Sequence, residues 1–355
     1  MTMDGFCSPS PCDCGRRRQG DTVGSMGLQV MNRSGTRQAR AGSSAPRRRR
    51  FEVVVVGGVS AGKSTFLNAL IGLELLHTAN RATTSCLTRV EHDRGRRGFA
   101  ASANGAAGEL LARAHAVVAG TMQRWNADPA VHAISAVGAF PGQAGRASGL
   151  VLLDTPGPNN SLDDGHGREA DEALRSGSAQ LLIHVLDAGH LGTHDDRRCL
   201  DAIRAHPRPA QSACFIVNKI DLLDAGRGER VADQLRQAHD YLEAAGFRAP
   251  VILPTAAAPA LFARKVLHGE PLTLAQGLRL HQALAAGPVD GIDCAINLPA
   301  GVQAGARAHL QSLRRAVQAR AASSPVAARD ALRLLVAQSG IGMAEMLIQH
   351  RREQP

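Results

Sequence analysis

Two short runs of the sequence place cations, carboxylates and hydroxyls at the spacing that nucleotide chemistry requires. The first is GGVSAGKS, Gly57 to Ser64, whose glycine, four residues, glycine, lysine and serine are typical of a phosphate-binding loop. Glycines let backbone N–H groups curl around a polyphosphate, and a helix starting near Lys63 points its positive end at the same anion. We predict that Gly57, Gly62, Lys63 and Ser64 bind the phosphates, with Lys63 at the β- and γ-phosphates and Ser64 on Mg²⁺.

Lysine usage supports this interpretation. The chain carries its positive charge almost wholly as arginine and has three lysines, of which Lys63 and Lys219 lie in candidate nucleotide motifs. A lysine supplies a compact point charge where the guanidinium fork of an arginine does not fit. The alternative is a glycine-rich turn between a strand and a helix that contains a lysine and a serine by chance.

The second run, ACFIVNKIDLLD, indicates which base the site takes. An apolar strand, Cys214 to Val217, delivers Asn218, Lys219 and Asp221 at its C-terminal end, where α/β sheets bind ligands. Asp221 can accept hydrogen bonds from N1–H and the 2-amino group of guanine, and adenine offers neither. We predict that Lys219 lays its stem along the base and that Asn218 ties this loop to the phosphate loop. Taken alone, NKID also fits an ordinary capped loop.

Between the two runs lie residues suited to Mg²⁺ and to a γ-phosphate. In GLVLLDTPGPNNS a buried strand ends at Asp154, which we predict to hold Mg²⁺ through water, while the Gly157 N–H senses the γ-phosphate. Upstream, Thr84 is predicted to bring its hydroxyl to Mg²⁺ and its carbonyl to the attacking water, ahead of Thr83 and Thr88. A Pro-Gly turn after a strand, and threonines on a half-buried strand, are the plainer alternatives.

These residues need a scaffold of strands and helices. The β-branched run Val53 to Val56 predicts a buried parallel strand, and with the strands before Asp154 and Asn218 it predicts an α/β fold with a central, mostly parallel sheet flanked by helices. A further strand is predicted over Ser85 to Val90. Helices are predicted over Gly105 to Asn126, Glu229 to Phe247, Leu272 to Ala285, Ala306 to Ala321 and Pro325 to His350.

Charge is unevenly distributed along the 355 residues, whose formal net charge is +10. Residues 1–50 contain ten arginines against three aspartates, and their Ser, Gly and Pro content predicts a disordered basic tail. The run APRRRR, Ala45 to Arg50, suits contact with DNA or an acidic membrane, although a solvated linker or a stretch translated from a misplaced start is the plainer interpretation. No apolar run approaches the length of about 18 residues that a membrane span needs, so we expect a cytoplasmic protein with no transmembrane segment.

In order along the chain, the motifs resemble those of the bacterial dynamin-like large GTPases. The resemblance runs from about Phe51 to about His350 and is carried by GGVSAGKSTFLNALIG, NRATTSCLTRV, LLDTPGPNNS and VLDAGHLGTHDDRRCLDAI. The run TPGPN looks most like a subgroup that includes a replication-clamp-associated member. The resemblance implies a GTPase domain over 51–350, between the tail 1–50 and a short C-terminal tail, 351–355.

The resemblance also implies roles for single residues. It makes Lys63, Thr84 and Gly157 the catalytic residues and Ser64, Thr84 and Asp154 the Mg²⁺ ligands. It adds Ser60, at the β–γ bridge, and Thr65 to the nucleotide contacts, and it makes Thr255, with Ala256, a weaker base contact.

The function that the resemblance implies is Mg²⁺-dependent binding of GTP and GDP and hydrolysis of GTP, with pairing of two copies across the nucleotide face. Dynamins proper carry a glutamine that orients the attacking water, where this chain has Val59. No helical stalk follows the GTPase region before Pro355, so we expect slow turnover with little self-stimulation. The alternatives are a GTP-binding switch with little hydrolysis and a truncated fragment of a longer protein.

Overall fold

A computed structural model describes residues 50–78, 86–117, 120–143, 146, 148–156, 178–207, 213–286, 292–319 and 324–354. Chain contacts divide the protein into two units, Met1–Arg47 and Arg48–Pro355, and every element below belongs to the second.

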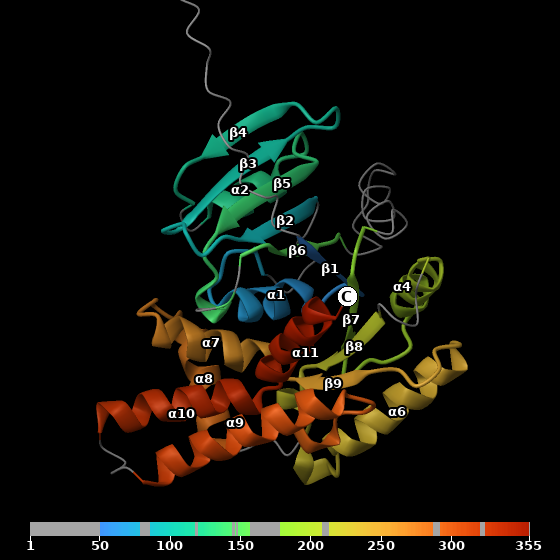
Figure 1. Ribbon diagram of the computed structural model, residues 1–355, viewed down its shortest axis with the longest axis vertical. Coiled ribbons are helices and arrows are strands. Elements are labelled where there is room, and N and C mark those ends of the chain that lie inside the picture. Colours follow the sequence, from blue (N-terminus) through green and yellow to red (C-terminus); the bar gives the residue numbers. More distant parts are fainter. Residues whose placement is uncertain are drawn as a thin grey trace, which may run out of the picture. The chain divides into compact units, whose positions relative to one another are not determined.

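Among the described residues, nine strands form one sheet in the order β4-β3-β5-β2-β6-β1-β7-β8-β9 (Figure 1). One half of it is wholly parallel and contains β6 (Leu150–Asp154), β1 (Phe51–Gly57), β7 (Leu181–Asp187), β8 (Ala213–Asn218) and β9 (Ile252–Thr255). The other half mixes directions and contains β2 (Leu87–His92), β5 (Ala133–Gly138), β3 (Phe99–Asn104) and β4 (Leu110–Ala114). The predicted α/β fold with a central, mostly parallel sheet is confirmed.

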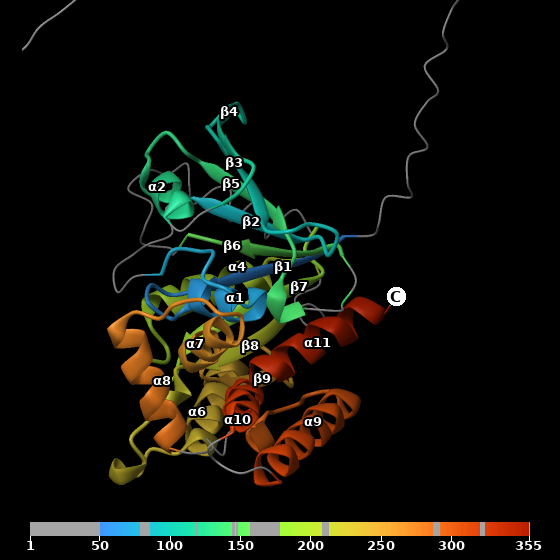
Figure 2. The ribbon, with the colours of Figure 1, turned by 90° about the vertical axis from the view of Figure 1, so that its left-hand side faces the viewer.

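Helices cover both faces of the parallel half. One face carries α1 (Lys63–Ile71), α7 (Ala257–Leu267), α8 (Leu274–Ala286), α9 (Ala300–Gln318), α10 (Pro325–Gln338) and α11 (Ile341–Glu353). The other face carries α4 (His194–Arg204) and α6 (Val231–Ala244), as Figures 1 and 2 show from two sides. Short helical segments are α2 (Thr121–Ala127), η1 (Pro141–Gln143), η2 (Ile220–Leu222), η3 (Ala225–Arg227) and η4 (Ile292–Cys294).

Alternate residues of β1 face two separate cores, as the side-chain period of a strand requires. Val53 and Val55 pack toward α1, α7 and the C-terminal helices, whereas Val54 and Val56 pack toward α4 and α6. All four side chains are buried. A strand with apolar neighbours on both faces explains why the sequence is continuously apolar here rather than alternating.

The predicted helix over Gly105 to Asn126 is wrong for most of its length. The chain instead turns back after β3, and β4 pairs antiparallel with it before the short helix α2 begins. Gly108 supplies a left-handed backbone (φ 79°) in this turn, and its carbonyl accepts a hydrogen bond from the Asn104 side chain. Alanine and leucine suit a helix locally, but pairing with β3 overrides that preference.

The predicted helix over Pro325 to His350 is two helices, α10 and α11, with an angle of 61° between them. The break lies at Gly340, whose φ of 80° is left-handed and whose α-carbon packs directly on the Pro254 carbonyl of β9. Any side chain there would collide with that strand. No single helix of the described residues is apolar and long enough to cross a membrane, and α10 with α11 meets that criterion only as a bent pair.

The remaining predicted elements agree with the structure to within a few residues. The strand predicted over Ser85 to Val90 is β2, and α6, α8 and α9 lie where helices were predicted, although α9 begins earlier, at Ala300.

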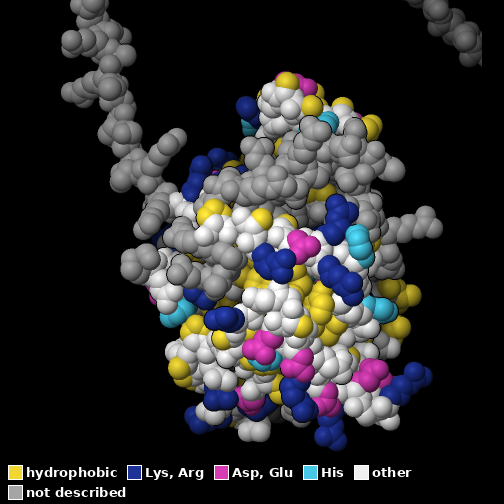
Figure 3. Space-filling view, turned by 90° about the vertical axis from the view of Figure 1, so that its right-hand side faces the viewer, with side chains coloured by type: hydrophobic (Ala, Val, Ile, Leu, Met, Phe, Trp, Pro, Cys, Tyr) yellow, Lys and Arg dark blue, Asp and Glu magenta, His cyan; other side chains and the backbone are white. Residues whose placement is uncertain are grey.

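On the face that carries α4 and α6, basic and acidic side chains are interspersed (Figure 3).

Candidate nucleotide-binding site

The predicted phosphate loop joins the C-terminal end of β1 to the N-terminus of α1. Ser60 (φ 64°) and Gly62 (φ 93°) both have left-handed backbones, and Gly62 is the N-cap residue of α1. A β-carbon on Gly62 would lie 2.5 Å from Asn218 Nδ2, and one on Gly57 would collide with the Val185 carbonyl of β7. These glycines therefore let the loop pass close to the neighbouring strands, which leaves the N-terminal N–H groups of α1 at the end of β1.

Lys63 is buried against the loop that precedes it. Its Nζ donates hydrogen bonds to the carbonyl oxygens of Gly57 (2.9 Å) and Gly58 (3.0 Å). Burial lowers the pKa of Lys63, while the nearby carboxylates, Asp154 foremost, act in the opposite direction. The ammonium group is thus held inside the predicted phosphate loop by two backbone carbonyls.

Ser64 and Asp154 meet at the point where α1 begins and β6 ends. The Ser64 hydroxyl donates to Asp154 Oδ2 at 2.7 Å, and both side chains are buried. A hydroxyl and a carboxylate are hard oxygen donors of the kind that Mg²⁺ prefers, so this pair fits the predicted metal position. Thr155 follows, and its hydroxyl donates to the Val55 carbonyl, which fixes the end of β6 against β1.

The predicted switch residues are only partly within the described chain. Thr83, Thr84 and Gly157 lie outside the described residues. Thr88, the other threonine considered, is buried on β2 directly opposite Asp154 in the antiparallel β2–β6 register. Thr65 is in the first turn of α1, next to Ser64.

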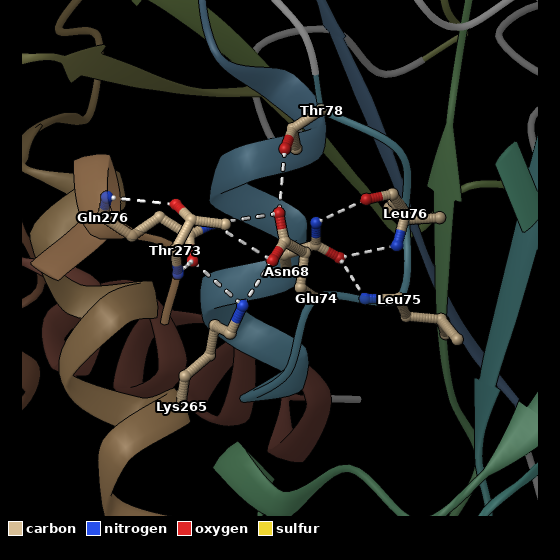
Figure 4. Close-up of polar contacts among 8 residues, drawn as sticks. All are labelled: Asn68, Glu74, Leu75, Leu76, Thr78, Lys265, Thr273 and Gln276. Atoms are coloured by element: carbon tan, nitrogen blue, oxygen red, sulfur yellow. Dashed lines mark hydrogen bonds and ion pairs between the residues drawn. The ribbon is translucent and has the colours of Figure 1, made fainter. Parts of the chain in front are cut away.

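A polar cluster fixes the chain between α1 and Thr78, just before the predicted switch segment (Figure 4). Asn68 of α1 is fully buried; its amide donates to the Leu76 carbonyl and accepts from the N–H groups of Leu75 and Leu76. Glu74 Oε2 lies 2.6 Å from Nζ of Lys265 on α7 and 3.2 Å from Nε2 of Gln276 on α8. The third lysine of the chain therefore has a structural partner rather than a place at the phosphate loop.

The Asn218 side chain joins the predicted phosphate loop to the predicted base-contacting loop by direct hydrogen bonds. Its Nδ2 donates to the Ala61 carbonyl at 3.0 Å, and its Oδ1 accepts from the Thr255 hydroxyl (3.0 Å) and the Ala257 N–H (3.2 Å). The hydroxyl of Thr255, the weaker predicted base contact, thus bonds to Asn218. The neighbouring Ala256 N–H donates to the Ser339 carbonyl at 2.8 Å.

Lys219 and Asp221 follow at the end of β8. Lys219 has a left-handed backbone (φ 66°), and its Nζ lies 2.7 Å from Asp187 Oδ2 at the end of β7. Burial raises the pKa of Asp221, and the Arg279 guanidinium on α8, 3.6 Å from Oδ2, opposes that rise. Asp221 and Arg279 both line a cavity of about 160 Å³.

Two residues at the site were not identified from the sequence. The Val59 N–H, in the phosphate loop, donates to Asp195 Oδ2 at 3.4 Å, so a carboxylate of α4 lies at an amide that could face an anion. The run from Thr193 to Asp196 carries a helix-capping pattern, which indicates the start of α4 but not its contact with the loop. Arg279 follows Asp221 by 58 positions, and nothing local in the sequence pairs the two.

The predicted phosphate, metal and base residues thus gather at one edge of the sheet, at the C-terminal ends of β1, β6 and β8. The contact of Asn218 with Ala61 joins the two predicted motifs directly. Ligands of open α/β sheets bind at this edge.

Residues 53–220, slightly less than half of the chain, match the sequence model described as the dynamin family. No curated protein matches the chain. Two of the solved structures that match come from work on an oligomerised bacterial dynamin pair, described as a mechanism for long-range sensing and tethering of membranes. The first is 14% identical and covers 77% of this chain and 44% of that one, with a TM-score of 0.47. The second is 17% identical and covers 68% and 38%, with a TM-score of 0.44. The chain therefore spans less than half the length of either.

Proposed function

We propose that the chain is a dynamin-like GTPase, which binds GTP with Mg²⁺ and hydrolyses it slowly to GDP and phosphate. The observation that supports the proposal is the set of hydrogen bonds at Asn218, because they hold the loop of Lys63 next to the loop of Asp221. The family match over residues 53–220, which includes the phosphate loop and Asp154, supports the same activity.

In this proposal each described side chain has one task. Lys63 leaves its loop carbonyls to contact the β- and γ-phosphate oxygens, and the N–H groups of the loop and of the first turn of α1 bind the same anion. Ser64 directly, and Asp154 through water, would hold Mg²⁺, which when bound neutralises charge on the phosphates. Thr84 and Gly157 keep their proposed switch roles.

The chemical step is in-line attack of water on the γ-phosphorus. The bond from the γ-phosphorus to the β–γ bridging oxygen breaks, and GDP and inorganic phosphate are released. Lys63 stabilises the charge that spreads over the transferred oxygens. Val59 has no polar group with which to orient the water, which is why we propose slow turnover.

Guanine selectivity is assigned to Asp221. Its carboxylate is largely buried at the cavity, and an adenine there would offer no donor to it. A buried carboxylate without a donor costs more than the lost hydrogen bond, so adenine is rejected.

The apolar residue at position 59 also favours a second candidate: a switch that holds GTP and barely hydrolyses it. In either case we also propose that two copies pair across the nucleotide face. The two candidates differ in the fate of bound GTP, so kinetics separates them.

The test is a single-turnover experiment on the full chain with excess protein, comparing GTP with ATP in wild type and Lys63→Ala. We expect GTP to bind and to disappear over minutes to hours, and ATP not to bind. Lys63→Ala should lose affinity by at least about tenfold, since it removes a buried charged contact to phosphate. GTP bound but intact for many hours would favour the switch, and binding unaffected by Lys63→Ala would rule out both. Turnover that rises steeply with protein concentration would contradict the expected weak self-stimulation.

A further inference from the structure

The cavity beside Asp221 is lined by residues that follow the segment 53–220 in the sequence. Helix α8 contributes Arg279, Gln282, Ala283 and Ala286, and α10 with its C-terminus contributes Leu335, Gln338 and Ser339. Its volume is about 160 Å³. A protein cavity of about 150 Å³ takes up a benzene molecule, so this one has room for a planar ring. On the proposed function, it is the place where the guanine edge meets Asp221.

Arg279 is the charged partner of Asp221 in the structure. The guanidinium Nη2 lies 3.6 Å from Asp221 Oδ2, and the side-chain exposures are 45% for Arg279 and 13% for Asp221. The nearer lysine, Lys219, does not take this place, because its Nζ is 2.7 Å from Asp187. The carboxylate that guanine needs is thus already paired.

Arg279 also has a second contact surface available. Its guanidinium carbon lies 5.9 Å from the ring centroid of Phe262 on α7, which is within the range of a cation–π contact. A half-exposed arginine with an aromatic face next to it can leave a carboxylate without losing all of its protein contacts.

We propose that Arg279 competes with the guanine base for Asp221: the guanidinium pairs with the carboxylate in the structure, and the base binds by displacing it. Both N–H donors of the guanine edge require the oxygens of Asp221, so base and guanidinium compete for one carboxylate. Arg279 is therefore a residue that sets nucleotide affinity, and it does so without contact with the phosphates. This inference rests on the proposed function.

The partial exposure of the Arg279–Asp221 pair determines how much, and in which direction, loss of Arg279 should change the affinity for guanine nucleotides. Partly exposed ion pairs are weak and are screened by salt, so removal of the competing charge should strengthen guanine binding by about two- to fivefold. The direction of the change in affinity distinguishes competition at Asp221 from a simple loss of positive charge. Loss of a positive charge near a polyphosphate would by itself weaken binding, so tighter binding can come only from relief of the competition.

The experiment measures the dissociation constants of GDP, ADP and pyrophosphate, each with Mg²⁺, for the full chain. The variants are Arg279→Gln, Arg279→Lys and the control Arg307→Gln, which removes an exposed arginine that pairs with Asp293 and does not line this cavity. We expect Arg279→Gln to bind GDP about two- to fivefold tighter at low salt, with the gain shrinking at high salt. Arg279→Lys and Arg307→Gln should stay near wild type. Pyrophosphate has no base, so its binding should not tighten in any variant.

Two failures are distinguishable. If wild type binds GDP and Arg279→Gln binds it equally or more weakly, Arg279 does not compete with the base, and this inference alone is wrong. If wild type binds pyrophosphate but shows no preference for GDP over ADP, the proposed function fails, and this inference fails with it. Circular dichroism and thermal unfolding of each variant check that the fold is retained.

Discussion

The amide of Asn218 illustrates how single side chains hold this site together. Its three hydrogen bonds reach the phosphate loop, the end of β9 and the first turn of α7. An aspartate there would lose the donor to Ala61, and a leucine would leave buried polar groups unpaired. Gly62 completes the fit, because its missing side chain leaves room for the asparagine amide.

Asp196 is the third residue of α4 and completes a capping box with the N-cap residue Thr193, so its charge should affect stability. Its Oδ2 accepts from the Thr193 N–H at 3.0 Å, and its Oδ1 lies 3.6 Å from Nε2 of the fully buried His184 on β7. Burial opposes ionisation, yet the contacts with His184 and Thr193 outweigh it and hold the pKa of Asp196 below its usual value.

This lowered pKa predicts a loss of stability in acid. A carboxyl whose folded pKa lies below its unfolded value, about 3.9, contributes fully above that pH and loses its contribution as the pH falls through the folded pKa. We expect Asp196→Asn to lower the free energy of unfolding at pH 7 by about 1 kcal/mol or more, because it weakens the cap, and to flatten the decline below about pH 4. Urea unfolding between pH 3 and 7 measures both. The control is Asp201→Asn, an exposed residue of α4, and an acid profile of Asp196→Asn that parallels wild type would contradict the prediction.

At the residue scale, the sequence predicts what local pattern encodes. Lys63, Ser64 and Asn218 lie in runs whose spacing alone indicates their chemistry, and the structure brings them to one edge of the sheet. Asp195 and Arg279 could not be found in this way, because each reaches the site from another helix through tertiary packing.

At the scale of elements, prediction is best where composition allows one structure. The β-branched run of β1 and the amphipathic pattern of α6 each favour one kind of element. The alanine- and leucine-rich stretch after Gly105 suits either a helix or a strand, and its partner, β3, decides. The break at Gly340 depends on the contact with Pro254, which lies far away in the sequence.

Helix α8 contacts two segments that are far apart in the sequence, the one at Glu74 and the one at Asp221. Gln276 contacts Glu74 before the predicted switch segment, and Arg279, one turn later, contacts Asp221 at the base side. Residues three apart share a helix face, so both contacts belong to one rigid element.

At the scale of the whole unit Arg48–Pro355, the C-terminal helices are part of the core. Arg264 of α7 and Glu345 of α11 form a buried ion pair at 2.7 Å, and Arg264 also donates to the Ala69 carbonyl of α1. Burial raises the pKa of Glu345, and the Arg264 guanidinium acts against this rise. The pair fixes α11 against the helix that begins at the phosphate loop.

Loss of one partner should leave a buried charge without its counterion. We expect Glu345→Ala to lower the free energy of unfolding by about 3–5 kcal/mol, whereas the double variant Arg264→Met/Glu345→Leu should lie within a few kcal/mol of wild type or above it. Urea unfolding at pH 7 measures both. A single variant that costs less than about 1 kcal/mol would show that this pair does not hold α11 in place.

The central claim is that guanine is recognised by Asp221 while its phosphates lie in the loop at Lys63. The most direct measurement is the affinity for GTP and for xanthosine triphosphate, in wild type and Asp221→Asn. Wild type should prefer GTP, and Asp221→Asn should lose GTP affinity by about 10²-fold or more while gaining affinity for xanthosine triphosphate, because the amide donates to the xanthine 2-oxo group. Unchanged GTP binding by Asp221→Asn, or a wild-type preference for ATP, would contradict the account.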